Sequence, residues 1–212
     1  MKYIIMCSGE YPNWKYPKQL SLIHGETLIN RTIRLLTENG VAKRDIKLTA
    51  TPTLRDILME NGLPVSVILR TTECWIDCFY PQSKPCVYLY GDVVYSPSAI
   101  KKIVETPTDS IEFFASAPPF AKNYSKKWAE PFAFKVTDQE YFKQCIQTVK
   151  ELDREGKFNR QPISWELWQV IKHTPINQID YTNYTVINDY TCDVDEPSDV
   201  LKFEGGELWR TT

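Results

Sequence analysis

The dipeptide Gly91-Asp92 directly follows an apolar run, residues 86–90, that is typical of a buried strand. Open α/β sheets bind their ligands beyond the carboxyl ends of strands, so an acidic residue at this point can hold a metal ion against a ligand. The alternative is that Asp92 only caps the helix expected near Ser96. The spacing alone leaves both interpretations open.

A second candidate site follows the first apolar run, residues 3–7. Free backbone N–H groups near Ser8 and Gly9, together with Lys15 or Lys18 from the next loop, could cradle a phosphate group. The loop contains neither the P-loop pattern nor the dinucleotide-binding pattern GxGxxG. The alternative is a solvated basic loop.

Three residues in the second half of the chain could bind an anionic or polar substrate. Arg160 carries a guanidinium fork that matches phosphate and carboxylate groups, and it precedes a predicted helix at residues 164–171. Trp165 of that helix could line a pocket or lie in the core. Glu130 is a charge within an otherwise apolar run, which favours a functional role over simple packing.

The remaining reactive side chains have ordinary explanations. His24 falls in a turn and His173 at a helix end, and two histidines argue against a histidine-based hydrolase. Cys74 and Cys78 supply too few ligands for a zinc site. Thr72 lies in a turn before a short helix, where it could contact a base or ribose or serve as a cap.

The elements that would position these residues alternate along the chain. Apolar runs predict strands at residues 3–7, 45–50, 65–69, 86–90, 111–116, 131–136 and 184–187. Helical periodicity and capping residues predict helices at residues 27–39, 53–61 and 164–171, and from residues 96, 138 and 197. Thr53, Ser96 and Asp138 are the expected caps. This alternation predicts an α/β sandwich with a mostly parallel sheet.

Length and composition limit the class of protein. The chain has 212 residues, which suits one domain, and its 42% apolar and 25% charged residues are typical of a globular protein. The net charge of −2 gives no basic surplus for nucleic acid. No apolar run is long enough for a signal peptide or a membrane span. The six cysteines are therefore expected to be reduced thiols in a cytoplasmic protein.

Three separated segments together resemble the nucleotidyltransferases that join a nucleoside triphosphate to a phosphorylated small molecule. The opening pieces are Tyr3-Ile-Ile-Met-Cys-Ser-Gly9, Pro17-Lys18-Gln-Leu20, Ile23-His-Gly25, Leu28-Ile29 and Arg31-Thr-Ile33. Gly91-Asp92 looks like the family's metal-binding aspartate. Residues 192–200, Cys-Asp-Val-Asp-Glu-Pro-Ser-Asp-Val, are similar to the segment with the second metal-binding aspartate, which falls at Asp195 in the best register and otherwise at Asp193.

The resemblance implies a fold and a set of site residues. The fold would be a single Rossmann-like three-layer α/β/α domain of the glycosyltransferase-A type, with residues 1–105 binding the nucleotide and residues 106–212 the acceptor. The nucleotide-binding residues would be Cys7, Ser8, Gly9, Lys15, Lys18, Thr72 and Gly91. Lys15 stands where the family usually has an arginine. Lys18, Asp92 and Asp195 would carry out catalysis, and the two aspartates would bind Mg²⁺. Glu130, Arg160 and Trp165 would contact the acceptor.

The implied activity is Mg²⁺-dependent transfer of a nucleotide from a triphosphate, with CTP favoured, to the phosphate of a small-molecule acceptor, releasing pyrophosphate. One alternative is a transferase of the same fold that uses a nucleotide sugar, although Asp92 is followed by Val93-Val94 and so lacks the Asp-x-Asp pattern of such enzymes. Another is a non-catalytic nucleotide-binding module. The 13% aromatic content suits either an aromatic-lined pocket or a subunit contact, such as a homodimer.

Overall fold

A computed structural model of the chain describes residues 1–8, 14–70, 74–116, 130–176, 179 and 181–204. The strands are β1 (Lys2–Met6), β2 (Leu22–Ile23), β3 (Glu26–Thr27), β4 (Ile46–Ala50), β5 (Ser66–Leu69), β6 (Cys86–Tyr90), β7 (Val93–Val94), β8 (Ile111–Ala115), β9 (Pro131–Val136), β10 (Thr185–Val186) and β11 (Cys192–Asp193). The α-helices are α1 (Leu28–Glu38), α2 (Pro52–Glu60), α3 (Pro97–Glu105), α4 (Gln139–Arg154), α5 (Ser164–Ile171) and α6 (Pro197–Glu204). Short 3₁₀ turns are η1 (Lys18–Leu20), η2 (Lys43–Asp45) and η3 (Trp75–Cys78).

The centre of the molecule is a seven-stranded mixed sheet with the order β10-β8-β9-β6-β1-β4-β5. Strand β1 pairs in parallel with β4 and β6, and β4 pairs in parallel with β5. Strand β9 runs antiparallel to both of its neighbours, β6 and β8. The carboxyl ends of β1, β4, β5 and β6 therefore lie at one edge, where ligands bind in sheets of this kind.

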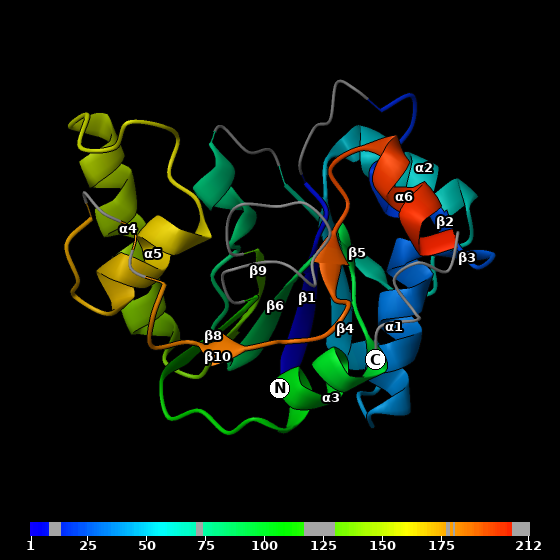
Figure 1. The fold of residues 1–212 in the computed structure, drawn as a ribbon, viewed down its shortest axis with the longest axis horizontal. Helices are drawn as coiled ribbons and strands as arrows, with labels where there is room; N and C mark the ends of the chain where they lie inside the picture. The colour runs from blue at the N-terminus through cyan, green and yellow to red at the C-terminus, as the bar shows by residue number, and fades with distance from the viewer. Residues whose placement is uncertain (9–13, 71–73, 117–129, 177–178, 180, 205–212) are drawn as a thin grey trace.

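Helices cover both faces of the sheet, as Figure 1 shows with α4 and α5 on one side and α1 on the other. On the first face, Phe134 of β9 contacts Phe142 of α4, and Phe113 of β8 contacts Trp165 of α5. Lys135 points the opposite way from its neighbour Phe134 and donates hydrogen bonds to backbone carbonyls at the end of α3. Helix α1 packs against α3. The predicted three-layer α/β/α sandwich is confirmed.

The predicted helix starts are confirmed with one exception. The side chains of Ser96 and Asp138 accept hydrogen bonds from the backbone three residues ahead and cap α3 and α4. Helix α2 was expected to be capped by Thr53, but Thr51 is the cap, because Pro52 occupies the first helical position. The two-stranded pairs β2–β3 and β7–β11 were not predicted. No helix of the described part is long and apolar enough to cross a membrane.

Candidate active site

Gly91 brings the chain that leaves β6 against the end of β1. Its backbone N–H donates to the Met6 carbonyl at 2.9 Å. A Cβ atom at this position would lie 2.5 Å from the Cys7 Sγ and 2.6 Å from the Met6 carbonyl oxygen. A side chain therefore does not fit, and the glycine lets the following Asp92 lie beside the carboxyl end of β1.

Lys18 and Asp92 form a salt bridge at this edge of the sheet. The Lys18 Nζ lies 2.7 Å from the Asp92 Oδ2, and the side chain of Lys18 is only 2% exposed. The same ammonium donates to the Val194 carbonyl at 2.9 Å. A buried ammonium is stable only with such partners. Lys18 therefore joins the loop after β1, the turn after β6 and the segment that follows β11.

The structure also excludes the alternative role for Asp92. Ser96 is the N-cap of α3, and its hydroxyl accepts the Ala99 N–H at 2.9 Å. Asp92 precedes this cap by four residues and is engaged with Lys18 instead. Its carboxylate, 19% exposed, keeps some contact with solvent. The Asp92 carboxylate is thus partly accessible to solvent, whereas the Lys18 side chain is buried.

The segment at residues 189–195 lies beside Asp92 and carries both candidates for the second metal ligand. We call it the return segment. Strand β11 pairs with β7, and the Val194 N–H donates to the Asp92 carbonyl at 2.8 Å. Asp193 is half-buried and Asp195 is exposed. The Asp195 carbonyl accepts from the Trp14 indole at 3.1 Å.

Glu130 is brought to the same place from the start of β9. Its side chain is buried, and its Oε2 accepts the Asp193 N–H at 3.1 Å. One potential ligand atom from each of Glu130, Cys192 and Asp193 lies within 4.8 Å of the others. Two carboxylates so close repel each other, and a cation between them would relieve the repulsion.

Cys7 and Ser8 end β1 at the edge occupied by Asp92. Burial raises the pKa of the Cys7 thiol well above its usual range, and the Asp92 carboxylate raises this pKa further. Cys7 is therefore neutral and cannot act as a nucleophile at neutral pH. Among the described residues, the buried Ser8 hydroxyl and the buried Gln19 Oε1 have no hydrogen-bond partner. Polar atoms of this kind are suited to a ligand.

Lys15 is exposed on the loop that leads to η1. Gly9 and Thr72, two of the expected nucleotide-binding residues, lie outside the described residues.

The expected acceptor residues on and before α5 have mainly structural contacts. Arg160 pairs with Glu166 at 2.8 Å, and Glu166 also accepts the Ile163 N–H at the start of α5. Trp165 is buried against Phe113, with ring centroids 4.9 Å apart. The cap position of α5 is Ile163, which has no capping side chain, so no local motif in the sequence marked Glu166 as the partner of Arg160.

Trp165 is nevertheless connected to the site through two neighbours. Its ring contacts Tyr184 with centroids 5.1 Å apart, and the Tyr184 hydroxyl donates to the Ser116 carbonyl at 2.9 Å. The Ser116 Oγ in turn accepts the Glu130 N–H at 2.8 Å. Trp165 is thus linked to Glu130 through Tyr184 and Ser116, whereas Arg160 is linked through Glu166 to the start of α5.

Sequence reasoning missed two residues at this edge of the sheet, Tyr95 and Arg70. The Tyr95 hydroxyl donates to the Phe132 carbonyl at 2.6 Å and accepts the Tyr90 N–H at 3.0 Å, so it joins β6 to β9. Arg70 follows β5 at the same edge, and its guanidinium lies 5.1 Å from the centre of the Tyr80 ring. Neither lies in a motif, and only the strand order shows that Arg70 is at the same edge as Asp92.

Comparisons with known proteins agree with this fold. No protein-family model and no curated protein matches the chain. The inositol-1-phosphate CTP transferase of T. maritima has a similar structure, with a TM-score of 0.60 and 18% identity over 100% of this chain and 97% of that chain. The 4-diphosphocytidyl-2C-methyl-D-erythritol synthase of Anaerococcus prevotii gives a TM-score of 0.59 and 11% identity over 99% and 98% of the two chains.

A candidate glucose-1-phosphate thymidylyltransferase of Bacillus anthracis gives a TM-score of 0.65 and 14% identity, over 96% of this chain and 94% of that chain. The chain therefore has the fold of the nucleotidyltransferases, as the resemblance of its motifs predicted. The structural similarity establishes the fold, whereas at identities below 20% the reaction has to be argued from the residues.

Proposed function

We propose that the protein is a Mg²⁺-dependent nucleotidyltransferase. It would transfer a nucleotide from a nucleoside triphosphate, CTP being favoured, to the phosphate of a small-molecule acceptor and release pyrophosphate. The observation that carries the proposal is the buried Lys18–Asp92 pair, which joins the ends of β1 and β6 to the return segment. The shared fold with a CTP transferase supports the same class of reaction.

A magnesium site at Asp92 would take its second carboxylate from the return segment. Mg²⁺ takes one or two protein carboxylates and leaves its other positions to water and phosphate oxygens. Asp92 would be the first ligand. Asp193 is our first choice for the second, because it is half-buried beside Glu130, and Asp195 from the same segment is the other candidate. The Cys192 thiol is too soft a ligand for Mg²⁺.

The remaining residues near Asp92 would orient the triphosphate. When bound, Mg²⁺ would neutralise charge on the phosphates. Lys18 would stabilise the charge that develops around the α-phosphate and the departing pyrophosphate. The backbone and hydroxyl of Ser8 would contact the nucleotide at the end of β1, together with Cys7, Gly9, Lys15, Thr72 and Gly91.

The reaction balances without a strong base. An oxygen of the acceptor phosphate would bond to the α-phosphorus, and the bond from that phosphorus to the bridging oxygen would break. The bridging oxygen would leave with pyrophosphate. The acceptor oxygen is already anionic, so no proton needs to be removed, and the work of the protein is positioning and charge stabilisation.

The acceptor would bind on the side of Glu130. The Glu130 carboxylate could accept hydrogen bonds from hydroxyl groups of the acceptor. Trp165 would support the position of Glu130 through Tyr184 and Ser116. Arg160 is the remaining candidate for the acceptor phosphate and would have to leave Glu166 to reach it. In this arrangement residues 1–105 bind the nucleotide and residues 106–212 the acceptor.

Pyrophosphate release tests the proposal. The protein is mixed with Mg²⁺, each of the five common triphosphates and a panel of sugar and polyol phosphates, and pyrophosphate is detected by a coupled pyrophosphatase assay. We expect release with one nucleotide and loss of release in Asp92→Ala. The control is Asp138→Ala, which removes the cap of α4 at the opposite edge of the sheet. Release that persists in folded Asp92→Ala would refute the metal role of Asp92.

A further inference from the structure

Within the described part of the chain, the return segment forms few backbone hydrogen bonds to other segments. Strands β7 and β11 contain two residues each, and one further backbone bond joins Val194 to Asp92. A two-stranded pair of this length is only marginally stable by itself. Yet this segment carries Asp193 and Asp195, so other interactions must fix its position relative to Asp92.

One carboxylate, that of Asp189, bridges the return segment and the start of α3. Its Oδ2 accepts hydrogen bonds from the hydroxyls of Ser96 and Ser98, at 2.5 Å and 2.8 Å. Its Oδ1 accepts the Thr191 N–H at 2.8 Å, and the Thr191 hydroxyl accepts the Ser96 N–H at 3.0 Å. The start of α3 thus donates three hydrogen bonds to Asp189 and Thr191, and the Thr191 N–H fixes the orientation of the Asp189 carboxylate.

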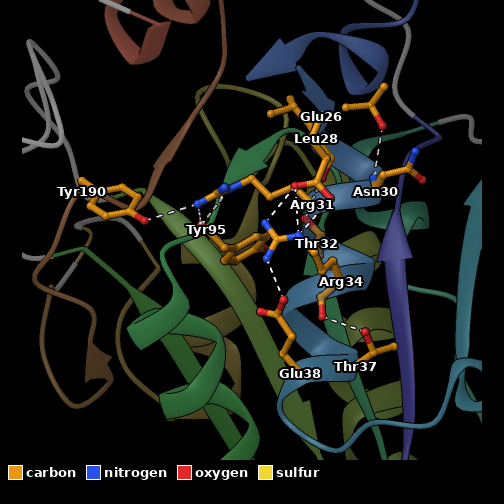
Figure 2. A network of polar contacts seen from close by, with 11 residues as sticks. Glu26, Leu28, Asn30, Arg31, Thr32, Arg34, Thr37, Glu38, Tyr95 and Tyr190 are labelled. Carbon is orange, nitrogen blue, oxygen red and sulfur yellow. Dashed lines mark hydrogen bonds and ion pairs between the residues drawn. The ribbon is translucent and has the colours of Figure 1, made fainter. Parts of the chain in front are cut away.

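A second contact beside Asp189 comes from α1. Figure 2 shows the Arg31 side chain reaching from α1 to the Tyr95 carbonyl and to the Tyr190 hydroxyl, both at 3.3 Å. Arg31 is 8% exposed, so these bonds are formed largely away from water. Arg31 thus ties the start of the return segment to the residue that precedes Ser96.

Both ends of this bridge lie close in sequence to a proposed metal ligand. Ser96 follows Asp92 by four residues, and Asp189 precedes Asp193 by four. Asp189 therefore holds together the two segments from which the metal ligands would come. We propose that Asp189 is a positioning residue that sets the separation of Asp92 and Asp193. This inference rests on the proposed function.

A positioning role predicts a specific change in metal dependence. Loss of a residue that orients metal ligands typically weakens metal binding by about 10- to 100-fold. A merely structural role would instead lower the melting temperature and weaken nucleotide binding equally with and without metal. The ratio of the CTP dissociation constants measured without and with Mg²⁺ separates the two cases.

The experiment measures this ratio by isothermal titration calorimetry, with CTP or whichever of UTP, GTP, ATP and dTTP binds most tightly. We expect Asp189→Ala to reduce the ratio about tenfold and to leave metal-free affinity unchanged. Asp189→Asn keeps an acceptor for the Thr191 N–H and a polar group for both hydroxyls, so it should restore most of the ratio. The control variant Asp138→Ala also removes one hydrogen-bonded carboxylate, but at the opposite edge of the sheet, and it should leave the ratio unchanged.

The outcomes distinguish this inference from the proposed function. A wild-type protein that binds no triphosphate would overturn the proposed function and this inference with it. A wild-type protein with metal-enhanced binding, together with an unchanged ratio in Asp189→Ala, would overturn the inference alone. An equal loss in Asp138→Ala would also refute it, because the effect would then be one of general stability.

Discussion

The Lys18–Asp92 pair makes an asymmetric prediction about stability. Asp92→Asn leaves an ammonium that is 2% exposed without its carboxylate, and breaking a buried pair in this way costs about 3–5 kcal/mol. Lys18→Met keeps the apolar stem and leaves Asp92, which is 19% exposed and retains contact with water. The main loss is then the donor to the Val194 carbonyl, worth about 1–3 kcal/mol.

Urea denaturation at pH 7 measures both values from the midpoint and slope of unfolding. The double variant, Lys18→Met with Asp92→Asn, should lose less than the sum of the two single changes, because residues in direct contact couple. Lys2 and Asp45 provide a more exposed control pair, 36% and 31% exposed, for which each change should cost much less than either change at Lys18 or Asp92.

Two results would contradict this reasoning. One is a larger cost for Lys18→Met than for Asp92→Asn, which would mean that the burial of the ammonium does not dominate. The other is strict additivity in the double variant, which would mean that the two groups do not stabilise each other. In thermal melts the Asp92→Asn change should lower the midpoint by about 6–20 °C for a chain of this length.

Three further predictions concern neighbouring residues. Gly91→Ala should destabilise the protein by about 1–3 kcal/mol in urea, because the added methyl group overlaps the end of β1, and a neutral effect would contradict the close approach. Asp193→Ala should reduce the Mg²⁺ enhancement of nucleotide binding more than Asp195→Ala, and the reverse order in calorimetry would assign the metal to Asp195. The raised pKa of the Cys7 thiol means that the unfolded state loses this proton first, so stability should fall as pH rises above about 8.5, and less steeply in Cys7→Ser. Equal slopes for both proteins between pH 7.5 and 9.5 would reject that cause.

The seven strands of the central sheet and the six helices of the described part were predictable because each carries its own local signal. The run at residues 86–90 is wholly apolar since β6 is buried on both faces, and Ser96 followed by Pro97 marks the start of α3. The cap of α2 was assigned two residues late, because Thr53 and Thr51 are chemically alike and only Pro52 separates them.

The contacts that complete the site join distant parts of the chain. Strand β7 pairs with a segment about a hundred residues later, and neither partner is long enough to show a periodic pattern. The Asp189–Ser96 bridge likewise has no local signature. Lys18 and Asp92 were both selected from the sequence as candidate site residues, but their contact with each other depends on the order of β1 and β6 in the sheet.

The central claim is that a nucleoside triphosphate binds at the edge that holds Lys18 and Asp92. A thermal-shift panel of CTP, UTP, GTP, ATP and dTTP, each with and without Mg²⁺, tests it most directly, because a ligand specific to the native state raises the melting temperature. We predict a shift that depends on Mg²⁺, largest for CTP and absent in Asp92→Ala. No shift with any triphosphate at millimolar concentration would contradict the claim.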